Sequence, residues 1–92
     1  MLIGRVLETF DIKGRGVVAA TDTTWEHLPR ELKLKIGDPI ELRSGNLVLL
    51  CTKIAGIEHC DPWTPKMLFA VLLPRDVRME DVPLGVEFWS VD

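Results

Sequence analysis

Alternating apolar and polar positions run through most of the chain and favour extended strands. Residues 2–12 alternate, with Val6 and Phe10 on one predicted face and a candidate bulge at Gly4. The Lys13–Gly16 turn follows, because glycine reaches positive φ without steric cost. Residues 17–20 are apolar at every position, which predicts a strand covered on both sides.

Four further segments are rich in apolar and β-branched residues between turn signals. They predict strands over residues 40–43, 47–57, 67–73 and 86–89. Residues 21–36 are less regular, and the spacing Thr23-x-x-Glu26 predicts a capping box that opens a helical turn over 25–28. A second short turn is expected within 76–80.

Six strands without a long helix predict one all-β domain over residues 1–92. Closing the sheet would remove edges that invite aggregation. The sequence therefore predicts a small, closed, six-stranded, Greek-key-like β-barrel with at most short helical turns, in which Trp89 lies in the core or at the rim.

Composition narrows the classes of partner. Hydrophobic residues make up 47% of the 92 residues, which is enough to form a packed core. Some apolar residues then remain at the surface, where they can contact a partner or a second copy. Fourteen acids and eleven bases give a net charge of −3. Because nucleic-acid binders usually carry a basic face, DNA binding is not expected, although a local RNA contact stays open.

Cysteine and histidine placement favours structural roles. Cys51 and Cys60, with His59 beside Cys60 and His27 far away, lack metal-ligand spacing, so neither a metal nor a cofactor is expected. A nucleophilic Cys60 activated by His59 is disfavoured, because adjacent side chains on an extended chain point apart. Without an apolar run of 18 residues or a signal-like start, the prediction is a cytoplasmic protein with reduced thiols and no membrane partner.

Four blocks resemble the second domain, a β-barrel, of translational GTPases such as elongation factor Tu and initiation factors. Their sequences are Phe10-x-Ile12-x-Gly14-Arg15-Gly16-x-Val18, Leu34-Lys35-Ile36-Gly37-Asp38-Pro39-Ile40-Glu41-Leu42, Thr52-Lys53-Ile54-Ala55-Gly56-Ile57-Glu58, and Val71-Leu72-Leu73 with Asp81-Val82-Pro83-Leu84-Gly85. The resemblance implies this barrel as a stand-alone domain. The phosphate-binding motif G-x-x-x-x-G-K-[ST] is absent, so the chain is not expected to hydrolyse GTP.

In this family the barrel helps to hold the aminoacylated end of tRNA or contacts ribosomal RNA. Glu58 matches the glutamate that lies near the terminal adenosine in those proteins, so the resemblance implies a contact there. Read from the residues alone, Glu58 is a strand-end carboxylate that caps a loop, and Arg15 pairs with a nearby acid such as Asp11.

Four candidate binding residues follow: Arg15, Trp25, Glu58 and Trp63. The two tryptophans lie in predicted loops and suit either a protein interface or stacking on bases. No catalytic arrangement is recognisable, so the first hypothesis is a non-enzymatic module that binds a translation-related protein or itself. An RNA, aminoacyl-tRNA-end or ribosome-binding protein is the alternative, and an acidic protein that blocks a basic toxin fits only size and charge.

Overall fold

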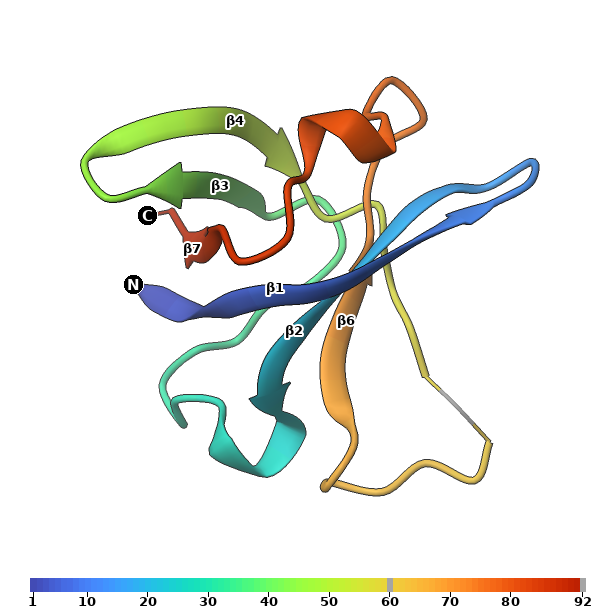
Figure 1. Ribbon diagram of the computed structural model, residues 1–92. Helices are drawn as coiled ribbons and strands as arrows, with labels where there is room; N and C mark the ends of the chain where they lie inside the picture. Colours follow the sequence, from blue (N-terminus) through green and yellow to red (C-terminus); the bar gives the residue numbers. More distant parts are fainter. Residues whose placement is uncertain (60, 92) are drawn as a thin grey trace.

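The protein is built from seven antiparallel strands in one sheet, as seen in a computed structural model that describes residues 1–59 and 61–91 (Figure 1). The strands are β1 (Leu2–Ile12), β2 (Gly16–Thr24), β3 (Pro39–Ser44), β4 (Leu47–Lys53), β5 (Gly56–Ile57), β6 (Leu68–Leu72) and β7 (Glu87–Ser90). Two short 3₁₀ turns, η1 (Trp25–His27) and η2 (Met79–Asp81), are the only helical elements described. The all-β prediction is confirmed.

The strand order is β4-β3-β7-β1-β2-β6-β5, and β1 holds the two halves together. Its first part, Leu2–Arg5, pairs with β7, whereas Val6–Ile12 pairs with β2. We call β4-β3-β7-β1 the first half of the sheet and β1-β2-β6-β5 the second half.

The prediction of a closed barrel with six strands is wrong, because the described residues form seven strands and the sheet is not closed. The predicted strand 47–57 is divided between β4 and β5, which form the two opposite edges. The N–H of Ile54 donates to Asp38 O at 3.0 Å on the β3 side, and the N–H of Ala55 donates to Leu72 O at 2.8 Å on the β6 side. The chain therefore crosses from one edge to the other within two residues, so no ladder forms between the edges.

The core lies between the two halves. Strands β3 and β6 point Ile40, Leu42, Phe69 and Val71 inward. The sequence predicts this alternation for β3, whereas the segment 67–73 is a continuous apolar run whose inward face is seen only in the structure. Phe69 meets Phe88 of β7 edge to face, with ring centroids 6.4 Å apart. Each such fully buried side chain stabilises the fold by about 1.5–3 kcal/mol.

Strand β2 is buried on both faces from Val17 to Thr21, as its apolar run predicts. The prediction for β1 is wrong after Val6. A bulge between Val6 and Glu8 inserts Leu7, so that Val6 stays in the core while Phe10 turns to the outer face and is 49% exposed. One inserted residue is enough to move the side chains after it to the other face, because successive side chains on a strand point to opposite faces. The predicted bulge near Gly4 is confirmed, with a register shift between Leu2 and Gly4.

The predicted capping box at Thr23 is wrong, although the short helical turn is present. β2 continues to Thr24, which precedes η1 and forms no side-chain cap. Thr23 instead donates its hydroxyl to Ile3 O at 2.7 Å, across the sheet. The second turn, η2, lies at the end of the predicted 76–80 segment, and the N–H of Arg78 donates to the Asp81 carboxylate at 2.9 Å.

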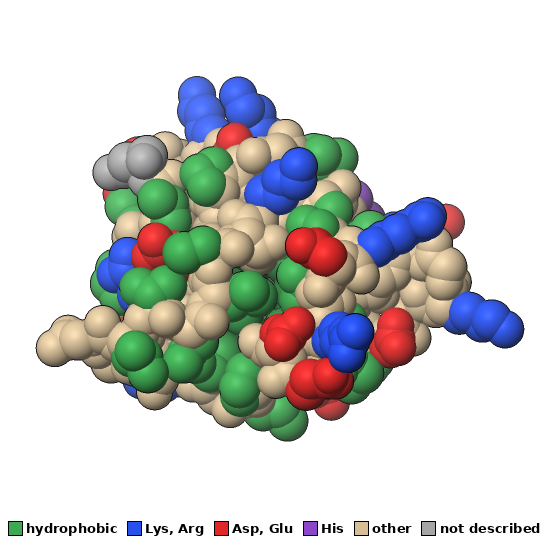
Figure 2. All heavy atoms as spheres, turned by 90° about the horizontal axis from the view of Figure 1, so that it is seen from above, with side chains coloured by type: hydrophobic (Ala, Val, Ile, Leu, Met, Phe, Trp, Pro, Cys, Tyr) green, Lys and Arg blue, Asp and Glu red, His purple; other side chains and the backbone are tan. Residues whose placement is uncertain are grey.

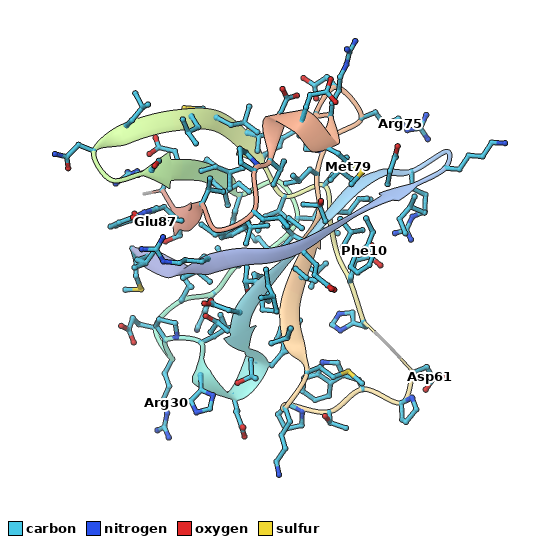
Figure 3. The ribbon with its side chains drawn as sticks, viewed as in Figure 1. Phe10, Arg30, Asp61, Arg75, Met79 and Glu87 are labelled. Carbon is cyan, nitrogen blue, oxygen red and sulfur yellow. The ribbon has the colours of Figure 1, made fainter. Side chains whose placement is uncertain are left out.

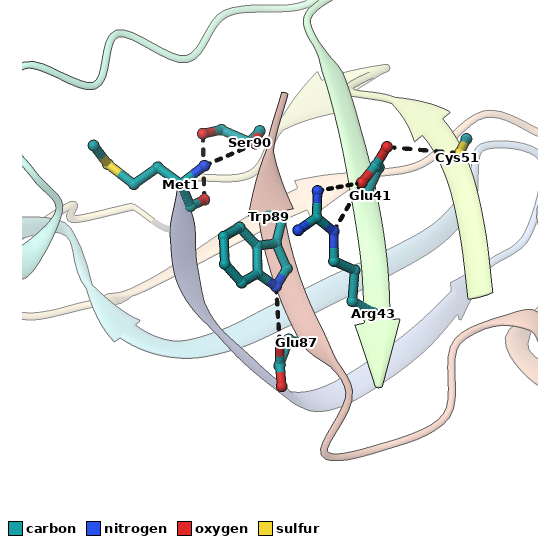
Figure 4. Close-up of polar contacts among 7 residues, drawn as sticks. All are labelled: Met1, Glu41, Arg43, Cys51, Glu87, Trp89 and Ser90. Carbon is teal, nitrogen blue, oxygen red and sulfur yellow. Dashed lines mark hydrogen bonds and ion pairs between the residues drawn. The ribbon is translucent and has the colours of Figure 1, made fainter. Parts of the chain in front are cut away.

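A polar network covers the outer face of the first half (Figure 4). The Arg43 guanidinium lies 4.3 Å above the Trp89 ring and bonds to Glu41, while the Trp89 indole N–H donates to Glu87 at 2.9 Å. Trp89 is therefore half-buried on the outer face, and the prediction of a core or rim position is wrong. Within the described residues, no helix is long and apolar enough to cross a membrane.

Candidate functional site

Three aromatic side chains gather around Trp25 at the end of the molecule that carries η1. The Trp25 ring stacks on His59, with centroids 5.3 Å apart and planes inclined by 19°. It meets Trp63 edge to face at 5.8 Å and Phe69 edge to face at 5.0 Å. We call Trp25, His59, Trp63 and Phe69 the tryptophan cluster. Phe69 is fully buried and Trp63 is 46% exposed, so the cluster extends from the core to the surface.

Two loops far apart in the sequence bring the cluster together. The N–H of Trp25 donates to Met67 O and that of Glu26 donates to Pro65 O, both at 2.9 Å. These bonds continue the pairing of Thr24 with Leu68 beyond the ends of β2 and β6. Figure 3 shows Arg30 and Asp61 on the loops at this end, far from Arg75 and Met79 at the opposite end.

A groove of about 350 Å³ lies beside the tryptophan cluster, and we call it the loop groove. Its apolar lining is Trp25, Leu28, Pro29, Leu32, Leu34 and Phe69. Glu26, Arg30 and Lys33 supply its charged lining, with a net charge of +1. Its size suits an apolar side chain or a small ligand, and the two cations favour an occupant that carries an acid.

Arg15 and Glu58 form an ion pair, with Arg15 Nη2 2.8 Å from Glu58 Oε1. Arg15 pairs with an acid, as expected, but the partner is Glu58 and not Asp11, because the β1–β2 turn places the guanidinium beside the chain that follows β5. Glu58 is fixed there by its own N–H, which donates to Ala70 O at 3.0 Å.

The four candidate binding residues thus form two contacting pairs on neighbouring parts of the surface. Glu58 precedes His59, whose ring stacks on Trp25, and Trp25 contacts Trp63. The sequence did not identify Phe69 as part of this site, and it did not identify His59 as a stacking partner of Trp25. It also missed the loop groove, although the alternation of Leu32 and Leu34 with exposed lysines signals one half-buried face.

The remaining cysteine and histidine candidates do not join this site. Cys51 is exposed on β4, with its Sγ 3.9 Å from Glu41 Oε2. Cys60 lies outside the residues that the structure describes. Across residues 1–59 and 61–91, no group of three or more His, Cys, Asp or Glu side chains is placed to hold a metal ion.

Comparison of this chain with models of protein families, with curated proteins and with solved structures finds no match.

Proposed function

We propose that this chain is a non-enzymatic, cytoplasmic binding module that recognises a protein partner through the tryptophan cluster and the loop groove. The observation that carries the proposal is Trp25, whose ring is held by Phe69 from the core and by His59 from the surface, next to a half-exposed Trp63. Aromatic side chains supported in this way contribute strongly to protein interfaces, because they bury a large area and lose little conformational entropy.

The charges beside the cluster specify the kind of partner. Arg30 and Lys33 line the loop groove, and neither forms an ion pair within the described residues. A partner segment with an apolar side chain next to an acidic one would place the first in the groove and the second near these cations. The kinship with the second domain of translational GTPases remains part of the proposal and rests on the four sequence blocks.

An RNA end is the second candidate, favoured by the neighbouring positions of Arg15 and the tryptophan cluster. Bases stack on aromatic rings and an arginine binds phosphate. The Arg15 guanidinium already pairs with Glu58 at 2.8 Å, so a phosphate would have to compete with that carboxylate. The net charge of −3 also opposes RNA binding. We therefore prefer the protein partner.

The test is capture of partners from a cell lysate by the tagged protein, with and without RNase. Trp63→Ala removes the exposed part of the cluster, and Met79→Ala is the matched control, being 42% exposed at the other end of the molecule. We expect one protein to be enriched by the wild type and by Met79→Ala, to survive RNase, and to be lost with Trp63→Ala. Enrichment that vanishes with RNase would favour the RNA candidate, and equal capture by both variants would contradict a role for the cluster.

A further inference from the structure

The two edges of the sheet differ greatly in length. The edge at β5 is only two residues long, which is one way in which proteins prevent unwanted strand pairing. The edge at β4 is seven residues long, and β4 pairs only with β3 within the described part of the chain. Strand β4 therefore offers unpaired backbone groups along a real edge.

The side chains of β4 do little to protect this edge. Residues 47–51 are all apolar, and Lys53 is the only charged residue of the strand. Leu47, Val48 and Leu49 are 62%, 43% and 41% exposed. Figure 2 shows hydrophobic side chains gathered over the half of this face where β4 runs, whereas charged side chains gather over the half around η2.

The hydrogen bonds of the neighbouring chain indicate which backbone groups face outward. Ile54 donates to Asp38, so by alternation Thr52 and Leu50 direct their N–H and C=O groups toward β3. Cys51, between them, directs its own groups to the open edge. A bulge at Leu49, where the register shifts between Leu42 and Arg43, limits the straight part of the edge to about Leu50–Thr52.

We propose that β4 pairs antiparallel with β4 of a second copy of this chain, with Cys51 facing Cys51 of that copy. A two-fold axis gives each copy the same contact, so the outward N–H and C=O of Cys51 bond to their equivalents. In this register Leu49 of each copy, at the bulge, comes close to Lys53 of the other at the two ends of the straight part.

The properties of the β4 edge favour a second copy of this chain as its binding partner. The straight part of β4, Leu50–Thr52, carries no charge, so it meets its own equivalent without like-charge repulsion. The two Lys53 residues would be about four residues apart along the strands, or roughly 13 Å, which exceeds the screening length of about 8 Å at physiological salt. A cleft of about 510 Å³, lined by Cys51, Thr52, Lys53, Pro74 and Asp76, lies beside this part of the strand and leaves room for side chains of the second copy.

The short straight edge also sets the strength of the contact. A standard interface covers about 800 Å² of each partner, and three paired residues with their neighbours cover less. The dimer is therefore reversible and forms as the concentration rises. Because β4 and η1 lie at opposite ends of the molecule, each dimer leaves both tryptophan clusters open (Figure 1).

Mass measurement over a concentration series, with paired charge variants, tests the contact. Leu49→Lys brings two lysines close together at both ends of the straight part, whereas Leu49→Glu brings a glutamate close to Lys53. Leu68→Lys is the matched control, since Leu68 is 39% exposed on β6. We expect the wild type, Leu49→Glu and Leu68→Lys to rise from 10.4 kDa toward twice that mass, and Leu49→Lys to stay at 10.4 kDa.

Amide hydrogen exchange tests the register in the same samples. The Cys51 amide should exchange quickly in dilute protein and at least tenfold more slowly at dimer-forming concentrations, while those of Leu50 and Thr52 stay protected throughout. A mass of 10.4 kDa at every concentration would overturn the proposal, as would equal effects of Leu49→Lys and Leu49→Glu. Self-association is read without a lysate, so its failure is distinct from that of partner capture through Trp63.

Discussion

Arg15 and Glu58 are separated by 43 positions in the sequence and lie 2.8 Å apart in the structure. Their contact joins the β1–β2 turn to the chain that follows β5, at the end of the second half of the sheet. Neither residue is buried, with side chains 53% and 26% exposed. The pair therefore positions a turn beside the tryptophan cluster more than it stabilises the fold.

A double-mutant cycle of Arg15→Ala and Glu58→Ala should give a coupling energy of about 0.2–1 kcal/mol that falls with added salt. Chemical denaturation of the four proteins measures it. The pair Arg78–Glu80 is the control, because its 3.7 Å contact is 78% and 71% exposed and should show no measurable coupling. Coupling of 2 kcal/mol or more, an order-of-magnitude bound for hydrogen bonds to charged groups, would mean that the Arg15 contact is far better shielded than its exposure indicates.

The two tryptophans of the cluster should differ in their effect on stability. Trp25→Ala removes the contacts with Phe69 and His59, and because Trp25 is only half-buried we expect the free energy of unfolding to fall by about 3 kcal/mol, the low end for a tryptophan. Trp63→Ala removes a half-exposed ring and should cost less than about 1 kcal/mol. Urea denaturation distinguishes them, and a larger cost at Trp63 would contradict the greater burial of Trp25.

Gly16 should tolerate no side chain. Its φ is +132°, and a Cβ there would lie 2.9 Å from Leu73 O, a backbone atom that cannot move away alone. Gly16→Ala should therefore cost more than the ~1–3 kcal/mol expected of strained backbone alone. Gly14→Ala, with φ at +83° and open space around it, is the control and should cost about 1–2 kcal/mol. Thermal unfolding compares them, and equal losses would argue against the close approach of β2 to Leu73.

Thr21 is the polar residue whose hydroxyl should matter most for folding. It is fully buried, and its Oγ1 donates to Phe69 O at 2.8 Å between β2 and β6. Thr21→Val keeps the shape of the side chain but removes the hydrogen bond to the Phe69 carbonyl. We therefore expect the free energy of unfolding to fall by about 1–3 kcal/mol. Thr52→Val on β4 serves as the comparison, since no side-chain hydrogen bond of Thr52 is present within the described residues, and should change stability by less than about 0.5 kcal/mol. Denaturation curves that shift equally for both would contradict the role of the Thr21 bond.

Local pattern was sufficient for much of the fold. The alternation in β3, the apolar runs of β2 and β6, and the glycine-rich β1–β2 turn each predicted the element that forms. Such features depend on neighbours in the sequence, because side-chain period and backbone freedom are local properties.

Register and edges depended on contacts that the pattern does not contain. The bulge at Leu7 turned Phe10 outward, and the crossing at Ile54 and Ala55 replaced the expected closure of the barrel. Both are decided by which strand is available to pair at each point, and that depends on segments distant in the sequence.

The candidate site divides in the same way. The sequence by itself determined the four candidate residues, because residue type and predicted position in a turn, a loop or a strand end can be read from the chain. They are Arg15, Trp25, Glu58 and Trp63. Only the tertiary structure decided that Arg15 meets Glu58 and that Trp25 meets His59, Trp63 and Phe69. Pairing of β2 with β6 places the loop that contains Trp25 beside the loop that contains Trp63. A hydrophobic pattern along the sequence does not show which distant strands pair.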